Sequence, residues 1–573
     1  MGDSDQSVYQ FTANGVPSSM IRHPTGRVAP RRAIVVFVVA TLATMSIAGG
    51  LAARSVTSDA DEGIAAFATA DFGGVTRATL ETNALPYKVV ATALLMRAER
   101  ARGVQLVRAD LPAVFREFGF TTPERIANWP TSIPAPHYDR PLGMVSRTVS
   151  GPIPLVRIDA VNLGCTTCHA GLLYDASGRV TNEAWIGAPS TSINLEGYTQ
   201  AVFQSLADGL RDQDAFRARI AILFPDMGRS ESFTLRFFLM RQVAKRIAEL
   251  QKEGAGPLPF SNGGAGRTNG VASLKHMLGM APGVASGHPD VGFTSIPELS
   301  GRGFRSSLLS DGIYAPIGAV RFDQTFDSAR VTTAHLDSLA DIVAFFTVST
   351  MGVQPIVGER AIPAMRPVLR WIGSAYRSSP FPGTIDSARM RAGQTVFNSR
   401  CSNCHGKYGD GAPRALLTFP NAHIEQSVMG TDSSRWAMVD SALLASIAQS
   451  AYERHMRSAQ SRGYVAPILS GLWSSAPYLH NGSVPTLWQL MSPTERPTRF
   501  MVGGHALDYE TMGIAGRTES DSVYRYPADY VAWSAPELFD TRRPGLSNKG
   551  HEREFVGLSA AQKWALIEYL KTL

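Results

Sequence analysis

Cysteine and long apolar runs are both scarce in this chain, which has 573 residues and only four cysteines. Hydrophobic residues make up 44% and charged residues 18%, which argues against a disordered chain and against one embedded wholly in a membrane. The net charge of +7 is mild for this length, and no run of Lys or Arg could follow a phosphate backbone. These shortages predict a protein that folds in water and does not bind nucleic acid.

One segment alone, residues 33–53 (AIVVFVVATLATMSIAGGLAA), is uncharged and long enough to cross a bilayer as a helix. Arginines outnumber acidic residues before it, so the positive-inside rule places residues 1–32 in the cytoplasm. The alternative is a cleaved signal peptide, for which the small residues before Arg54 give a weak cleavage site. We expect an uncleaved inner-membrane anchor, with the rest of the chain in the periplasm; cleavage would release it into the periplasm.

All four cysteines fall into two Cys-x-x-Cys pairs, and a histidine directly follows each pair. The two clusters are Cys165, Cys168 and His169, and Cys401, Cys404 and His405. With 12 histidines in the chain, chance would produce both on the order of once in two thousand, and Cys-x-x-Cys-His is the attachment pattern of haem c. Two disulfides are the ordinary alternative in an exported protein, and a zinc site would need a second pair nearby. The pattern therefore predicts two covalently bound haem c groups.

In this pattern the two sulfurs form thioethers to the haem vinyl groups, and the adjacent histidine lies under the iron as its proximal ligand. Covalent attachment leaves the other axial ligand and the surrounding groups to set the redox potential. The role of each iron therefore depends on what occupies its second axial position.

The second haem motif lies in a recognisable cytochrome c module. Residues 386–400 predict an amphipathic helix that runs into Cys401, and residues 559–573 predict a final helix. The first and last helices of cytochromes c cross, and a small residue on one admits an aromatic residue of the other. We expect Gly393 to lie opposite Tyr569 at this crossing.

The first haem motif lies in a longer and less regular region. Apolar periodicity predicts helices near 194–222, 231–253 and 335–349, whereas residues 254–334 are rich in Gly and Pro and predict a long ordered loop. We expect a mainly α, loop-rich fold with two cytochrome c-like haem domains behind one N-terminal transmembrane helix. The expected boundaries are 1–32 for a cytoplasmic segment, 33–53 for the anchor or signal peptide, 54–377 for the N-terminal haem domain, 378–385 for a linker and 386–573 for the C-terminal cytochrome c domain.

Further motifs are spread over most of the chain. They are Gly264 to Asn269 (GAGRTN), Ile296 to Gly312 (IPELSGRGFRSSLLSDG), CSNCHG at the second haem motif, Ala476 to Leu487 (APYLHNGSVPTL), Pro493 to Phe500 (PTERPTRF) and Asn548 to Glu552 (NKGHE). Together they resemble the dihaem cytochrome c peroxidase superfamily and, more narrowly, its RoxA-like branch of the rubber oxygenase type. The Ala-Pro-Tyr-x-His-x-Gly block is shared with the peroxidases, and the late Gly-His-Glu is similar to the RoxA-like branch.

The resemblance implies that the C-terminal haem is held by His405 and by a late histidine, which falls on His551. Two imidazoles fill both axial positions, so this iron would exchange electrons without binding oxygen or peroxide. The N-terminal haem, with His169 as proximal ligand, would then be the reactive one. Its open distal side would be lined by apolar and aromatic residues, for which Phe304 and Tyr314 are our candidates.

Other residues keep alternatives open. His276 and His288 could be distal ligands of the N-terminal haem, although each alone fits an ordinary loop histidine. Relatives often carry a tryptophan after the Pro-x-Leu step, between the haems, where this sequence has Ser300. We interpret His480 as a structural residue near the C-terminal haem. Three methionines are alternative sixth ligands in that half: Met491, Met501 and Met512.

These residues are compatible with three functions. We favour a haem-dependent oxidoreductase, in which the open N-terminal haem activates dioxygen or a peroxide while the C-terminal haem supplies an electron. The second is a pure electron carrier for a membrane redox complex. The third is a cytochrome c peroxidase, which would need an acid or base over the open haem, and Glu298 and Asp311 are the nearest carboxylates. The expected partners are the membrane and either a redox protein or a small oxidant.

Overall fold

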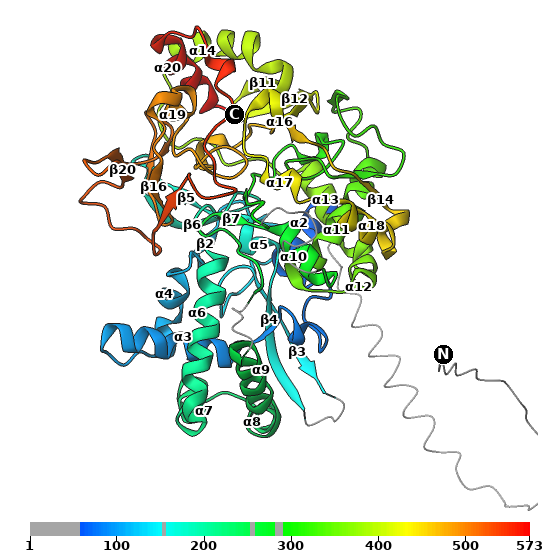
Figure 1. Ribbon diagram of the computed structural model, residues 1–573, viewed down its shortest axis with the longest axis vertical. Helices are drawn as coiled ribbons and strands as arrows, with labels where there is room; N and C mark the ends of the chain where they lie inside the picture. Colours follow the sequence, from blue (N-terminus) through cyan, green and yellow to red (C-terminus); the bar gives the residue numbers. More distant parts are fainter. Residues whose placement is uncertain (1–57, 152–155, 253–257, 281–289) are drawn as a thin grey trace, which may run out of the picture. The chain divides into compact units, whose positions relative to one another are not determined.

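The computed structural model describes residues 58–151, 156–252, 258–280 and 290–573, all within one compact unit (Figure 1). The helices of its first part are α2 (Asp59–Thr69), α3 (Tyr87–Arg102), α4 (Leu111–Arg116), α5 (Cys165–Cys168), α6 (Leu195–Gly209), α7 (Gln213–Leu223), α8 (Arg229–Thr234), α9 (Met240–Lys252), α10 (Gly270–Met277), α11 (Thr333–Met351), α12 (Pro355–Arg360) and α13 (Ile362–Ser374). Those of its second part are α14 (Ser387–Arg400), α15 (Ser402–His405), α16 (Gln426–Met429), α17 (Ser434–Ala437), α18 (Ser441–Ala448), α19 (Leu487–Met491) and α20 (Ala560–Leu570).

The strands are short and form several small sheets. Their bounds are β1 (Leu85–Pro86), β2 (Arg125–Ile126), β3 (Met144–Ser150), β4 (Arg157–Leu163), β5 (Ala170–Tyr174), β6 (Val180–Ile186), β7 (Arg267–Thr268), β8 (Thr294–Ser295), β9 (Tyr314–Pro316), β10 (Phe326–Asp327), β11 (Lys407–Gly411), β12 (Arg414–Phe419), β13 (His423–Glu425), β14 (Met456–Ser458), β15 (Gly463–Val465), β16 (Arg499–Val502), β17 (Leu507–Asp508), β18 (Gly513–Ile514), β19 (Arg517–Thr518), β20 (Val523–Arg525) and β21 (Glu537–Asp540). The larger sheets have the orders β1-β4-β3, β2-β6-β5, β10-β12-β11 and β19-β20-β16-β21.

The expectation of a mainly α fold behind a transmembrane helix is wrong. The structure is 42% helix and 16% strand, and α10 interrupts the region predicted as one long loop. Strands of two to seven residues are too short to show a clear alternation in the sequence, and some depend on a distant partner, as β9 does on β14. Within the described ranges no helix is both long and apolar enough to span a membrane. The segment that carried that prediction, residues 33–53, lies outside them.

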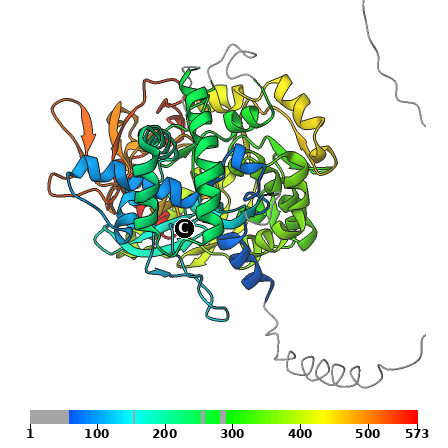
Figure 2. The ribbon, with the colours of Figure 1, turned by 90° about the horizontal axis from the view of Figure 1, so that it is seen from below.

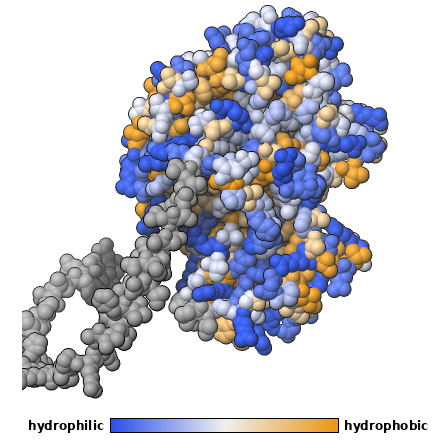
Figure 3. All heavy atoms as spheres, turned by 180° about the vertical axis from the view of Figure 1, so that it is seen from behind, coloured by the Kyte–Doolittle hydropathy of each residue, from blue (hydrophilic) through white to orange (hydrophobic). Residues whose placement is uncertain are grey.

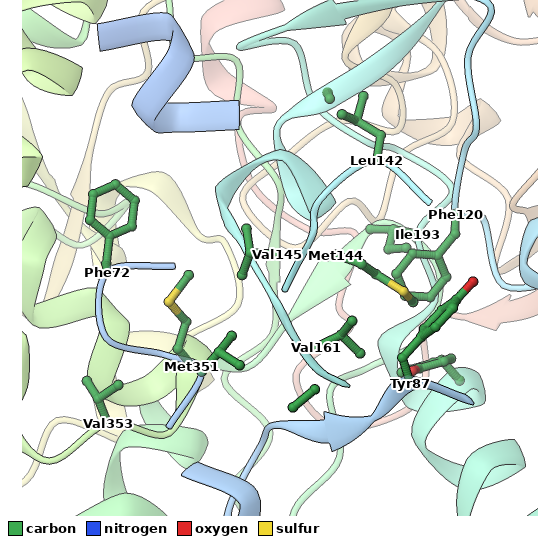
Figure 4. Close-up of a cluster of buried hydrophobic side chains, with 14 of the residues drawn as sticks. Phe72, Tyr87, Phe120, Leu142, Met144, Val145, Val161, Ile193, Met351 and Val353 are labelled. Carbon is green, nitrogen blue, oxygen red and sulfur yellow. The ribbon is translucent and has the colours of Figure 1, made fainter. Parts of the chain in front are cut away.

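The first hydrophobic core lies around the first haem motif. Figure 4 shows part of it, where Met144, Val145 and Val161 of β3 and β4 gather with Met351 of α11 and Tyr87 of α3. These residues are nearly inaccessible to water, so their burial contributes to the stability of the half that contains His169.

A second core lies around α14, α20 and the sheet that contains β16. Each core also includes side chains from the other half of the sequence. Leu443 and Ile447 of α18 belong to the first core, and Tyr174 and Phe293 belong to the second. Residues 378–385 remain the predicted domain boundary, and these side chains tie the two halves together across it.

Within the unit, α14 and α20 lie at one end and α7, α8 and α9 at the other (Figure 1). The view from below brings the teal and green helices of that second end to the front (Figure 2). The face seen from behind is mainly hydrophilic with scattered apolar residues, as is usual for a globular surface (Figure 3).

Helices α14 and α20 cross, as the sequence predicts, and the first of them runs directly into the second haem motif. A methyl group on Gly393 would lie 1.8 Å from the carbonyl oxygen of Ala565, so this glycine admits the backbone of α20. The ring of Tyr569 packs instead on Phe397, with ring centres 5.0 Å apart. The backbones of α14 and α20 therefore lie closer together at Gly393 than they could with a side chain between them.

Gly393→Ala is expected to lower the free energy of unfolding by about 1–3 kcal/mol, because the two helices must move apart to admit the methyl group. Urea denaturation measures this. Gly270→Ala is the control, since nothing lies within 4 Å of an added methyl there. An equal loss of unfolding free energy in both variants would contradict the close approach of α14 and α20.

Candidate haem sites

Each Cys-x-x-Cys-His cluster folds as a single helical turn, α5 or α15, that ends at or beside its histidine. The backbone N–H of His169 donates to the carbonyl of Cys165 at 3.0 Å, and that of His405 donates to Cys401 at 2.9 Å. The turn therefore keeps two sulfurs and one imidazole close together, which is the donor set that haem c requires.

A proline carbonyl orients the imidazole in both clusters. His169 Nδ1 donates to the carbonyl of Pro297 at 3.1 Å, and His405 Nδ1 donates to that of Pro467 at 2.8 Å. Because a carbonyl can only accept, the proton sits on Nδ1 and the Nε2 lone pair is left for a metal. This is the arrangement expected of a histidine that binds iron.

The two prolines begin loops of matching sequence and conformation. The loops are residues 297–312 (PELSGRGFRSSLLSDG) and 467–482 (PILSGLWSSAPYLHNG). Positive φ values occur at matching positions in both: Gly301 and Gly471 (75° and 64°), Leu309 and Leu479 (69° and 68°), and Gly312 and Gly482 (59° and 66°). We did not predict this repeat, although Pro-x-Leu-Ser-Gly stands in the chain twice. Both motif histidines thus bind the first residue of the same kind of loop.

Both clusters open onto one cavity of about 1620 Å³, which also contacts His551. Small-molecule pockets usually measure about 300–1,000 Å³, so this cavity has room for two ligands of that size. Much of its lining is apolar, including Val89, Leu274 and Leu490. The space and the donors therefore fit two haem c groups.

None of the four cysteines is in a disulfide. Burial raises the pKa of the Cys165, Cys168 and Cys401 thiols to about 12, and it also raises that of Cys404. Among the residues that the structure describes, no three His, Cys, Asp or Glu side chains are grouped as a metal site requires. The alternatives of two disulfides or a zinc site are therefore less well supported than thioether attachment.

His551 lies across from His405, with ring centres 6.0 Å apart and ring planes at 19°. Metal–imidazole bonds of about 2.0–2.1 Å on both sides of an ion would leave the two ring centres roughly 6 Å apart. The backbone N–H of His551 donates to Met429 at 3.1 Å, and Phe555 stacks on its ring at 5.1 Å. This geometry supports the predicted axial pair, which remains a prediction.

The surroundings of His169 are different, because the aromatic ring beside it is a phenylalanine. Phe67 of α2 lies 6.5 Å away between ring centres, and it lines the cavity. Tyr314 also lines the cavity and packs edge-on against Phe345 at 5.7 Å. Phe304 is not among the described residues that line it. Phe67 was not predicted, because it belongs to no motif.

The two histidines proposed as distal ligands have different outcomes. His276 is exposed on α10, where it lines the cavity and packs against Phe260 at 6.0 Å between ring centres. His288 lies outside the described residues. Among the described residues His276 has no face-to-face arrangement with His169 of the kind that His551 forms with His405.

Glu298 is buried directly beside Pro297, which binds His169. The hydroxyl of Tyr376 donates to Glu298 Oε1 at 2.5 Å, and the N–H of Ser300 donates to the same oxygen at 3.0 Å. Burial raises the pKa of Glu298 to about 7. This carboxyl was a candidate for an acid over the open haem, but it follows the residue that holds the proximal histidine. It is therefore better placed to act on His169 than on a distal ligand.

Glu298→Gln is expected to remove a pH dependence of stability. The folded-state pKa of about 7 lies above the ordinary 4.5, so the folded state holds the proton more tightly and wild-type stability falls as pH rises between these values. Across this pH range the wild type should lose roughly 3 kcal/mol of its free energy of unfolding. The glutamine variant should keep it. Urea unfolding at about pH 5 and about pH 8 tests this prediction. An equal change in the free energy of unfolding between the two pH values in both proteins would contradict it.

The remaining candidates occupy varied positions. Asp311 forms a buried ion pair with Arg435 at 3.4 Å. His480 lines the cavity and stacks on Tyr464 at 4.2 Å, and burial lowers its pKa to about 4. Of the three methionines, Met491 lines the cavity, whereas Met501 lies in β16 and Met512 belongs to the second core.

One comparison with known proteins bears on this site, and two others find uncharacterized relatives. A family model described as RoxA-like, cytochrome c-like matches residues 463–501, which include the loop that orients His405. The uncharacterized protein y4iM of Sinorhizobium fredii is 30% identical over 234 residues, covering 34% of this chain and 50% of that protein. The uncharacterized protein y4iJ of the same organism is 28% identical over 281 residues, covering 39% of this chain and 44% of that protein.

The chain thus spans about half the length of the curated relatives it matches. The family match covers the loop from Pro467 and the residues that follow it, on the C-terminal side of the cavity. This match supports a relationship to the RoxA-like haem c proteins over that part of the chain.

Proposed function

We propose that this protein is an extracytoplasmic dihaem c-type cytochrome that acts as an oxidoreductase. His169 would hold the N-terminal haem, which would supply activation of dioxygen or a peroxide. His405 and His551 would hold the C-terminal haem, which would supply electron exchange. The observation that carries the proposal is the asymmetry between the two motif histidines: an imidazole faces His405 at 6.0 Å, whereas the ring beside His169 is Phe67.

A haem iron with one free axial position supplies binding and activation of an oxygen species, and one with two imidazoles supplies electron transfer. The residues of this chain position the two imidazoles that would bind the irons. Pro297 fixes the tautomer and the orientation of His169, and Pro467 does the same for His405. Apolar residues along the cavity, such as Phe67 and Phe345, keep bulk water away from the N-terminal site.

Glu298 and Tyr376 form a buried pair of proton-exchanging groups beside Pro297, the residue that orients His169. Glu298 directly follows Pro297 in the chain, and the hydroxyl of Tyr376 donates to its carboxyl. A negative charge on Glu298 would favour the more positive state of the nearby iron, because opposite charges attract strongly where water is excluded. The pair therefore supports a role for Glu298 in setting the redox potential of the N-terminal haem.

An electron paramagnetic resonance spectrum of the oxidised protein tests the proposal. The expected result is one high-spin signal from the N-terminal haem and one low-spin signal from the C-terminal haem. Two low-spin signals that do not respond to cyanide or peroxide would contradict the proposal and indicate a pure electron carrier. Oxygen uptake and peroxide-dependent oxidation of a reduced donor then distinguish the two oxidants.

A further inference from the structure

A helical arm formed by α8, a π-helix (Leu235–Leu239) and α9 extends along the end of the molecule opposite α14 and α20 (Figure 1). Its inner face is already packed. Leu235, Met240 and Ile247 are buried, and Glu231 forms an ion pair with Lys88 at 2.8 Å. Contacts of the inner face therefore fix the arm on the rest of the molecule, and the outer face is not needed for this packing.

Three phenylalanines cluster on that outer face. Phe233, Phe237 and Phe238 are 39%, 46% and 40% exposed. The ring of Phe233 lies 4.9 Å from that of Phe237 and 5.9 Å from that of Phe238. Leaving three neighbouring aromatic rings in water is unfavourable, and a contiguous exposed patch of this kind is typical of an interaction site. The π-helix that carries two of them is a rare feature that is frequent at functional sites.

The residues around these rings are mainly basic. The exposed cations of the arm that do not line the cavity are Arg229, Arg236, Arg241 and Lys252. The arm's acidic residues are both engaged, Glu231 with Lys88 and Glu249 with Lys245 and Arg246. The guanidinium of Arg236 lies over the ring of Phe237 at 5.4 Å. The outer face is thus an aromatic cluster surrounded by positive charge.

We propose that this arm docks on an anionic lipid surface, with Phe233, Phe237 and Phe238 inserted at the level of the headgroups. Aromatic rings on one side of a helix with Lys and Arg flanking them are the pattern of an interfacial helix. The cations complement anionic headgroups, and their long side chains can reach those groups while the rings enter the apolar layer. The inner side of the arm, including Val243 and Leu250, lines the cavity, whereas Phe233, Phe237 and Phe238 do not line it. The proposal concerns these outer rings and does not depend on the proposed haem chemistry.

Vesicle binding by the holoprotein, folded as the full chain and then cleaved after Ala53 so that the expected anchor is removed, tests the proposal. We expect more binding to vesicles of phosphatidylcholine with phosphatidylglycerol than to phosphatidylcholine alone, and weaker binding at high salt. Changing Phe233, Phe237 and Phe238 together to serine should weaken the binding by at least about tenfold. Val531→Ser is the matched control, since Val531 is an apolar residue that is 86% exposed elsewhere on the surface. Thermal unfolding verifies that all variants are folded.

A local measurement excludes binding through any other part of the chain. Hydrogen exchange in peptides covering residues 229–252 should slow when anionic vesicles are added to the wild type, and should not slow in the triple variant. Exchange that is unchanged by vesicles, or binding that is equal in the two proteins, would overturn the proposal. So would a dimer that the triple variant abolishes while vesicles leave the wild type unbound, because the patch would then be a contact between two copies of the chain.

Discussion

Replacing His551 with alanine is expected to convert the C-terminal haem from low-spin to high-spin iron. In the proposed site the imidazoles of His405 and His551, whose ring centres lie 6.0 Å apart, would together give the strong ligand field of a six-coordinate iron. Removal of one imidazole leaves that axial position to water or to nothing. Paramagnetic resonance and the visible spectrum both report the change, and the variant should gain the ability to bind cyanide at this haem.

His276→Ala is the matched control, because this histidine also lines the cavity but is exposed and has no imidazole opposite it among the described residues. It should leave both signals unchanged. An unaltered low-spin signal in His551→Ala would mean that another residue, such as Met491 in the same cavity, holds the axial position. A change in the N-terminal signal of His276→Ala would instead identify His276 as a ligand of the first haem.

Replacing Cys165 and Cys168 together with serine is expected to leave one covalent haem on each chain instead of two. Serine cannot form the thioether bonds, whereas His169 and the cavity alone hold a haem only reversibly. The haem content measured as pyridine haemochrome, together with the intact mass, should show the loss of half the haem. The remaining signal should be the low-spin one.

The matching variant, with Cys401 and Cys404 changed to serine, should lose the low-spin signal and keep the high-spin one. The two variants therefore assign each spectroscopic signal to one motif. Retention of two covalent haems in either variant would contradict the assignment of that motif.

The sequence predicted the parts of the site that depend on fixed spacing. Both Cys-x-x-Cys-His motifs form the turns expected of them, and α14 and α20 cross beside the second. His551, which the resemblance to the RoxA-like branch implied, lies opposite His405. The turns and the helix crossing follow from local covalent constraints and from the helix period, and both can be read directly from the residues.

Other parts of the site depend on contacts between distant segments. The carbonyls of Pro297 and Pro467 orient the two histidines, but a backbone carbonyl leaves no mark in the residue types. Phe67 comes from a helix with no motif, and the raised pKa of Glu298 depends on how deeply the fold buries it beside Tyr376. The small sheets were missed for the same reason, since strands of two or three residues exist only where a partner pairs with them.

Acid-acetone extraction followed by spectroscopy of the purified chain is the most direct test of the central claim, which is covalent haem at both cysteine clusters. We predict that the pigment stays with the protein, that a Soret band is present, and that the intact mass corresponds to the chain plus two haems. A colourless protein, or pigment that passes into the acetone, would contradict the claim.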